Sequence, residues 1–198
     1  MNISTEHMIQ DRLMWRLKQE TSSEHDRMEV LMQRAGVFEN QENYAQFTLS
    51  QYYFQKDVEH LYQDEKVQQL IPDLAVRGRS DAALHDLADL ALVPQQQKPA
   101  TTSVTYPESL GWIYVSEGST LGAAFLFKQA QAKFGFDADF AARNLAAYPE
   151  GRAIVWKRFK QTLDDAHFTM QEKNQIVQGA LQGFKRFGDL LADLKNLK

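Results

Sequence analysis

The chain has 198 residues, no cysteine and a formal net charge of −4. This length suits one domain, which we expect to span residues 1–198, and the missing thiols exclude disulfide frameworks, thiolate zinc sites, iron–sulfur clusters and cysteine nucleophiles. The negative charge and the lack of a long Lys/Arg run argue against nucleic acid as the main partner. Any metal must therefore be bound by nitrogen or oxygen.

The N-terminal segment Met1–Trp15 has neither a basic region nor a continuous apolar region, so it does not resemble a signal peptide. The most apolar stretch, Leu110–Phe127, is interrupted by four polar residues, which argues against a membrane span. We therefore expect a cytoplasmic protein that is not bound to a membrane.

The first predicted helix carries an apolar stripe at three- and four-residue spacing, formed by Leu13, Leu17, Thr21, His25, Met28 and Met32. Thr21–Glu24 also matches a capping box, which would start a new helix there. The unbroken stripe favours a single helix that ends at Gly36.

Further helical segments follow in chain order. A second helix runs from Glu42 to about Gln63, and Pro72 closes the next short segment. The proline-containing stretch Val93–Pro107 is expected to be an exposed connection between two parts of one bundle. The remaining predicted helices are Glu108–Phe134, Asp137–Ala147, Glu150–Asp165 and Met170–Leu197. The chain is thus expected to form an all-α bundle of seven or eight helices.

His25 lies on the apolar stripe of the first helix, where an imidazole serves either core packing or ligand binding. The pattern alone favours a hydrogen-bonded core histidine. Glu29, one turn later, could accept a hydrogen bond from the ring nitrogen that does not bind a metal. Lys18 lies about 10 Å earlier along the helix, close to the same face. A solvated flank also accounts for Lys18 and Glu29.

Three glycines, Gly111, Gly118 and Gly122, share one face of the helix predicted over Glu108–Phe134. Each glycine inside a helix costs about 1 kcal/mol relative to alanine, so three on one face need a reason. Close packing against another helix and close approach of a flat ligand explain them equally well.

Two segments resemble haem oxygenases: Leu17–Glu29 is similar to their proximal segment and Leu110–Phe125 to their distal helix. The resemblance extends through the final helix and is nearest to bacterial enzymes that release iron from host haem. It implies a helical bundle with haem sandwiched between the proximal and distal helices. A small neutral distal face suits oxygenation of the ring, whereas a distal acid would favour peroxidase chemistry.

By this resemblance His25 is the proximal iron ligand, and Gly118 and Gly122 frame the oxygen pocket with Ser119 between them. Animal enzymes carry an aspartate at the Ser119 position, so a different water network is implied. The resemblance also implies that Lys18 and Lys157 contact the propionates and that Tyr114 contacts the ring edge or a propionate. Phe184 and Phe187 match aromatics that pack on haem, although plain core packing also explains them.

The resemblance implies that haem b, iron protoporphyrin IX, is both cofactor and substrate. O2 and electrons would open the ring to biliverdin with release of Fe2+ and CO. Lys18 and Tyr114 resemble enzymes with the ordinary haem orientation, which predicts the IXα isomer. The electrons would come from a ferredoxin, a flavodoxin or an NAD(P)H-dependent reductase, and the purpose would be iron acquisition.

Two alternatives remain open at this point. The pairs Asp57/His60 and Asp164/His167, with Glu29 and Glu117 as partners, suit a non-haem di-iron oxidase on a similar bundle. A haem-binding or haem-storage protein without turnover would share His25.

Overall fold

The computed structural model describes residues 12–146 and 148–197, and within these ranges it contains helices and no strand. This confirms the expected all-α class. The α-helices are α2 (Leu13–Glu20), α3 (Ser22–Ala35), α4 (Gln41–His60), α5 (Glu65–Leu70), α6 (Ser80–Asp89), α7 (Ser109–Phe134), α8 (Arg152–Asp165) and α9 (Met170–Ala192). Short 3₁₀ helices occur at Leu61–Gln63, Leu74–Val76, Arg143–Leu145 and Leu194–Asn196.

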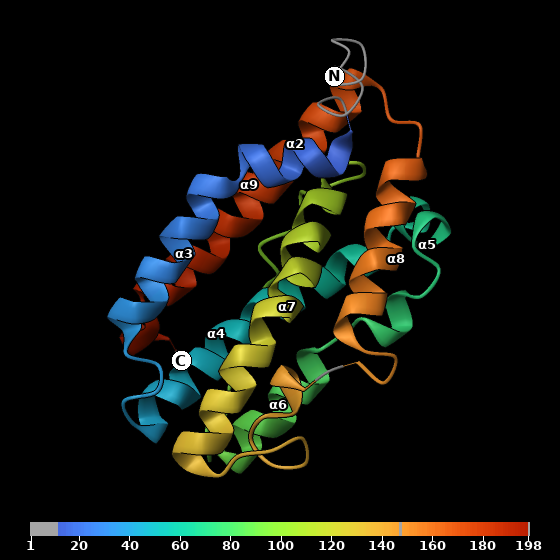
Figure 1. The fold of residues 1–198 in the computed structure, drawn as a ribbon. Helices are drawn as coiled ribbons and strands as arrows, with labels where there is room; N and C mark the ends of the chain where they lie inside the picture. Colours follow the sequence, from blue (N-terminus) through green and yellow to red (C-terminus); the bar gives the residue numbers. More distant parts are fainter. Residues whose placement is uncertain (1–11, 147, 198) are drawn as a thin grey trace, which may run out of the picture.

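The centre of the bundle is the crossing of α7 and α9, with α4 packed against both (Figure 1). Two glycines permit this crossing. A Cβ added to Gly111 would lie 2.0 Å from the carbonyl oxygen of Ile176, and one added to Gly179 would lie 2.0 Å from that of Glu108. No other residue type fits at either position, because the two backbones are in contact there.

α2 and α3 run along α9 on the outside of the bundle, and α8 lies beside α7 (Figure 1). α2 buries Leu13 and Leu17, whereas α3 has no buried residue. α3 is therefore held at the margin of the core, mainly by α9.

Most predicted boundaries are confirmed to within a few residues. The helix expected over Glu42–Gln63 is α4 with the short 3₁₀ helix that follows it, and α7, α8 and α9 match their predicted segments. Val93–Pro107 contains no helix. This connection is tied down at its centre, where Thr101 is buried and donates a 2.6 Å hydrogen bond to the carbonyl oxygen of Asp57.

The single first helix is a wrong prediction, because the chain divides at Thr21 into α2 and α3. Thr21 has φ −109° and ψ 6°, outside the helical values. Its hydroxyl donates to the carbonyl oxygen of Leu17 at 2.7 Å instead of capping α3, so the predicted capping box does not form either. The hydroxyl satisfies the last turn of α2, and α3 starts in a new direction.

The helix predicted over Asp137–Ala147 is also wrong: among residues 137–146 the only helical turn is the 3₁₀ turn Arg143–Leu145, and Ala147 lies outside the described residues. Two carboxylates of α6 bind the backbone amides of this segment. Asp86 accepts hydrogen bonds from the amides of Arg143 and Asn144 at 2.9 and 2.8 Å, and Asp89 accepts one from Ala141 at 2.9 Å. These tertiary acceptors replace the carbonyls of a helix.

A helix with the length and apolar character needed to cross a bilayer is not found in the described part of the chain.

Candidate functional site

His25 lies on the exposed side of α3, and 68% of its side chain is accessible. The apolar stripe on which we placed it is fully buried at Leu13, Leu17 and Thr21. Beyond the change of direction at Thr21, Met28 and Met32 are partly buried and His25 is not. The expectation that His25 points into the core is therefore wrong. The alternative of a hydrogen-bonded core histidine falls with it, so the imidazole is available to a ligand.

Glu29 lies beside His25, with its Oε1 atom 3.7 Å from Nδ1 of the imidazole. This distance exceeds a normal hydrogen bond, and the Glu29 side chain is as exposed as that of His25. A small rotation of either side chain would bring Oε1 within reach of the ring. The two residues are thus brought together as predicted, as neighbours that do not yet form the hydrogen bond.

Tyr114 links α7 to the junction of α2 and α3. Its ring packs on Trp156 of α8, with the ring centroids 5.6 Å apart. Burial raises the pKa of Tyr114, and a hydrogen bond with Thr21 lowers it in part. Because the net shift is upward, the phenol is protonated at neutral pH and can donate a hydrogen bond.

The three predicted glycines of α7 have different surroundings. Gly111 touches α9, as described above, so packing explains it. A Cβ added to Gly118 would meet only the Trp156 ring, at an ordinary 3.6 Å, and one added to Gly122 would meet no described atom within 4 Å. Packing between helices therefore does not explain Gly118 and Gly122, and the open space at Gly122 favours the close approach of a flat ligand.

The surface around these two glycines is apolar. Leu121 and Phe125 are exposed on the same stretch of α7, Phe125 to 65%. At 100° per residue, Phe125 lies within about 20° of Gly118 around the helix axis. Large exposed apolar side chains beside a backbone without Cβ atoms suit a large apolar ring.

Ser119 is exposed, and its hydroxyl donates a 2.6 Å hydrogen bond to the carbonyl oxygen of Ser116. With its proton used in this way, the oxygen can still accept hydrogen bonds from water. Glu117 is turned to the other side of α7, where it pairs with Arg77 at 2.5 Å. The stretch between Gly118 and Gly122 thus presents a hydroxyl acceptor and no acid.

The other predicted site residues lie on α2, α8 and α9. Lys18 and Lys157 are exposed on α2 and α8. Phe184 and Phe187 are half-buried on α9 and pack on the main core cluster, where the Phe187 ring centroid lies 5.2 Å from that of Phe54. For Phe184 and Phe187, core packing is at least part of the role.

The two aspartates of the di-iron alternative have other partners. Asp57 accepts hydrogen bonds from Arg186 and from the amide of Ala100, and Asp164 accepts one from the amide of Met14. Within residues 12–146 and 148–197, no group of three or more His, Asp or Glu side chains is placed to hold a metal ion. This geometry contradicts the di-iron alternative.

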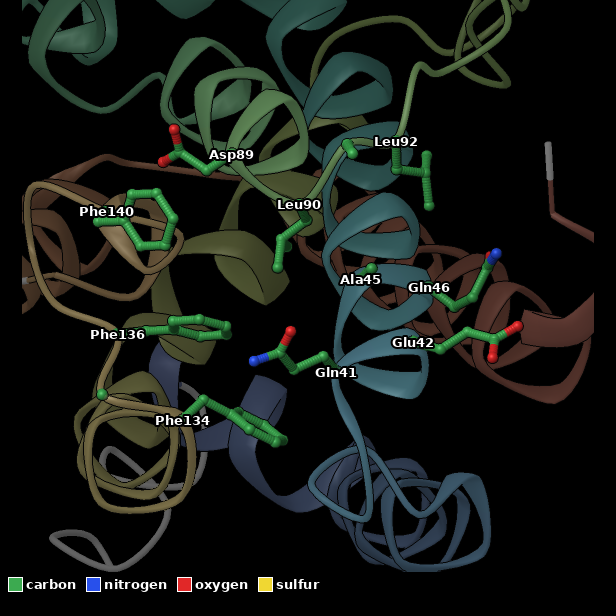
Figure 2. A pocket seen from close by; sticks show the side chains of 12 residues that line it. Gln41, Glu42, Ala45, Gln46, Asp89, Leu90, Leu92, Phe134, Phe136 and Phe140 are labelled. Carbon is green, nitrogen blue, oxygen red and sulfur yellow. The ribbon is translucent and has the colours of Figure 1, made fainter.

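A cavity of about 710 Å³ lies away from these residues, between the start of α4, the end of α6 and the end of α7 (Figure 2). Phe134, Phe136 and Phe140 line one side and Gln41 of α4 points in from the other. None of the predicted site residues lines it. The candidate site is therefore the open face of α7 at Gly118 and Gly122 together with the exposed His25 of α3, and not this cavity.

Trp156 packs on Tyr114 and faces Gly118, and its place at the site could not be predicted from the sequence. It lies next to Lys157, but on a helix whose path could not be inferred from spacing. The only signal was the tryptophan itself, in a helix that also carries other apolar residues.

Comparison with known proteins identifies the family and the fold. The family model described as "Heme oxygenase" matches residues 11–193. The chain is 45% identical over 178 residues to the heme oxygenase PigA of Pseudomonas aeruginosa, covering 89% of each chain. The NO- and CO-bound heme oxygenase of Neisseria meningitidis has a similar structure, with a TM-score of 0.87, 34% identity and coverage of 95% of this chain and 94% of that one. The heme oxygenase of Leptospira interrogans shares the fold, with a TM-score of 0.76, 18% identity and coverage of 92% and 99%.

Proposed function

The chain belongs to the haem oxygenase family, and we propose that it binds haem between α3 and the Gly118–Gly122 stretch of α7, with His25 as the axial ligand of the iron. Membership makes the chain a haem-degrading enzyme, so the storage alternative is set aside. The observation that carries the proposed site is the uncovered backbone at Gly122, which no packing contact explains. The exposed imidazole on α3 supplies the second half of the site.

We propose that Lys18 and Lys157 hold the propionates, because both are exposed cations on helices next to the site. Tyr114 would add a hydrogen bond from its protonated hydroxyl at the ring edge or to a propionate. Glu29 would accept the hydrogen bond from His25 Nδ1 and so leave Nε2 for the iron. Phe184 and Phe187 would close the apolar side of the ring from α9.

Bound haem b supplies the iron that activates O2 and the ring carbon that is oxidised. Gly118 and Gly122 bring the α7 backbone close to that carbon, because neither has a side chain to hold it away. Ser119 accepts hydrogen bonds from water and thereby orients a proton source without supplying an acid. Leu121 and Phe125 limit the entry of further water.

We propose that the products are biliverdin IXα, Fe2+ and CO, and that the reaction serves iron release from haem in the cytoplasm. Electrons must come from outside the chain, through a ferredoxin, a flavodoxin or an NAD(P)H-dependent reductase. The IXα assignment depends on Lys18 and Tyr114, which resemble the residues of enzymes with the ordinary haem orientation.

Adding haemin to the purified protein and then supplying reductant and O2 tests the proposal. A Soret band followed by conversion to biliverdin absorption is the expected result. A stable Soret band without conversion would contradict turnover, and no Soret band would contradict haem binding at this face.

A further inference from the structure

Glu117 is a fully buried carboxylate directly before Gly118 on α7, with 0% of the residue accessible. Its Oε2 atom lies 2.5 Å from a guanidinium nitrogen of Arg77, and its Oε1 atom accepts a 3.2 Å hydrogen bond from Tyr148. A buried carboxylate without such partners costs several kcal/mol, so these two contacts decide where it can lie. Glu117 lies about 100° from Gly118 around the helix axis, so its contacts hold α7 on a side that does not face the proposed ligand.

Arg77 is itself held rigidly. Its side chain is 1% accessible, and Asp73 accepts two hydrogen bonds from it at 2.8 and 2.9 Å. Asp73 also accepts a 2.9 Å hydrogen bond from Arg158 of α8. The guanidinium of Arg77 lies over the Phe159 ring of α8, 5.5 Å from its centroid. The ion pair of Glu117 thus anchors α7 to α8 and to the segment after α5.

The anchored stretch of α7, residues 116–122, has a low intrinsic tendency to stay helical. Gly118 and Gly122 lower its helix propensity. The hydroxyls of Ser119 and Thr120 each donate to the carbonyl three residues earlier, at 2.6 and 2.7 Å. Hydroxyl bonds of this kind compete with the helical ladder and bend helices. The backbone between 116 and 122 is therefore pliable.

A second anchor acts on the same stretch from the same neighbours. Arg152 of α8 donates a 2.7 Å hydrogen bond to the carbonyl oxygen of Thr120. Its other guanidinium nitrogen donates to the carbonyl oxygen of Leu145, also at 2.7 Å. Both anchors lie away from the uncovered face at Gly122, so they can set the position of the backbone without touching a ligand there.

We propose that Glu117, held by Arg77, is a positioning residue that sets how closely the Gly118 backbone approaches the bound ring and thereby which bridging carbon is oxidised. The inference rests on the proposed function. It assigns Glu117 a role in product selection although the residue contacts neither haem nor O2. Glu117 is expected to affect the isomer ratio and the rate, whereas haem affinity depends on the residues proposed to contact haem directly.

The test is Glu117→Gln, which keeps the shape of the side chain and removes its charge. We expect amide hydrogen exchange of residues 116–122 in the haem-free protein to become at least about tenfold faster, since local opening is less strongly opposed. With haem, we expect a mixture of biliverdin isomers, a kcat lowered about tenfold or more and an affinity for haemin within about twofold of the parent, because small displacements cost rate more than binding.

Two comparisons separate positioning from general destabilisation. Arg77→Lys should stay closer to the parent isomer ratio than Arg77→Met. Asp86→Asn removes another buried carboxylate paired with an arginine, on α6, and should lower stability without changing the ratio or the exchange of residues 116–122. If Glu117→Gln does not fold, Tyr148→Phe removes one hydrogen bond to Glu117. It should change the isomer ratio and the exchange of residues 116–122 in the same direction by a smaller amount.

A folded Glu117→Gln protein with parent exchange rates at residues 116–122, or with the parent isomer ratio, would overturn the inference. Failure of the parent protein to convert haem would instead count against the proposed function, and the exchange measurement would still report on the anchor.

Discussion

The backbone of Gly111 lies so close to Ile176 that an added Cβ would stand 2.0 Å from the Ile176 carbonyl oxygen, whereas the same addition at Gly122, on the same face of α7, meets no described atom within 4 Å. α9 covers this face of α7 at its start and leaves it before Gly122. One glycine is therefore required by the fold, and the other keeps space free.

Replacing the two glycines by alanine should change the free energy of unfolding in opposite directions. Gly122→Ala should stabilise the haem-free protein by about 0.5–1 kcal/mol, because alanine is the better helix former and its methyl group has room. Gly111→Ala should destabilise it by about 3 kcal/mol, because the two backbones must separate. Urea unfolding of both variants measures these differences.

Haem conversion gives the functional half of this prediction. Gly122→Ala should slow conversion despite its higher stability, since the methyl group occupies space meant for the ring. A variant that is both more stable and as active as the parent would show that Gly122 does not face the substrate.

The sequence predicted the helices well where each helix makes its own hydrogen bonds and buries one side. It did not predict the loss of the helix over Asp137–Ala147, because the acceptors that replace the helical carbonyls are Asp86 and Asp89, about 50 residues away in the chain. Nor could spacing distinguish Gly111 from Gly122. The distinction depends on the path of α9, which a pattern within α7 does not contain.

For His25, too, spacing along the chain did not predict the surroundings of the side chain. Its place on an apolar stripe predicted burial, but the chain changes direction at Thr21, and beyond that point Met28 and Met32 are partly buried while His25 is exposed. The residue proved more available to a ligand than its pattern indicated. Only the resemblance to a family, and not the periodicity, distinguished it from the histidines on other helices.

Replacing His25 by alanine should abolish the axial histidine signature of the haemin complex and lower conversion at least about hundredfold, because it removes the imidazole proposed to bind the iron. The free energy of unfolding should change by less than about 0.5 kcal/mol, since the His25 side chain is exposed. Visible and electron paramagnetic resonance spectra of the haemin complex provide the measurement.

His85→Ala is the matched control, as another exposed helical histidine on α6. It should leave spectrum and conversion unchanged, and added imidazole should restore the spectrum of the His25 variant alone. Persistence of the parent spectrum in His25→Ala would mean that another residue binds the iron.

The product of the parent protein should be predominantly the α isomer of biliverdin, as separated by chromatography. Lys18→Gln and Tyr114→Phe should each raise the share of other isomers, because both proposed contacts fix the rotation of the ring. Lys56→Gln, at an exposed lysine of α4, should not. A parent product dominated by the β or δ isomer would contradict the assignment of Lys18 and Tyr114.

The α preference should also be independent of pH from about 6 to 9. Burial raises the pKa of Tyr114 above its usual value of about 10, so its hydroxyl keeps its proton over this range. A change of isomer ratio with a midpoint inside the range would show that another group controls the orientation.

Asp73 should make the stability of the haem-free protein sensitive to acid. Burial raises the pKa of Asp73, but hydrogen bonds from Arg77 and Arg158 and their positive charges outweigh it, so the pKa lies below its usual value. The folded protein therefore binds a proton at Asp73 less readily than the unfolded chain. This contribution to stability is complete above about pH 4 and is lost as the pH falls through the folded pKa.

Asp73→Asn should consequently cost about 1.5–3 kcal/mol at pH 7, where it removes charged hydrogen bonds, and progressively less below pH 4. Urea unfolding at pH 7, 5 and 3 measures the difference between variant and parent. Asp26→Asn, at an exposed carboxylate of α3, should differ from the parent by less than about 0.5 kcal/mol at each pH. A cost of Asp73→Asn that stays constant down to pH 3 would mean that shape and packing, and not the carboxylate charge between Arg77 and Arg158, hold this side of α7 in place.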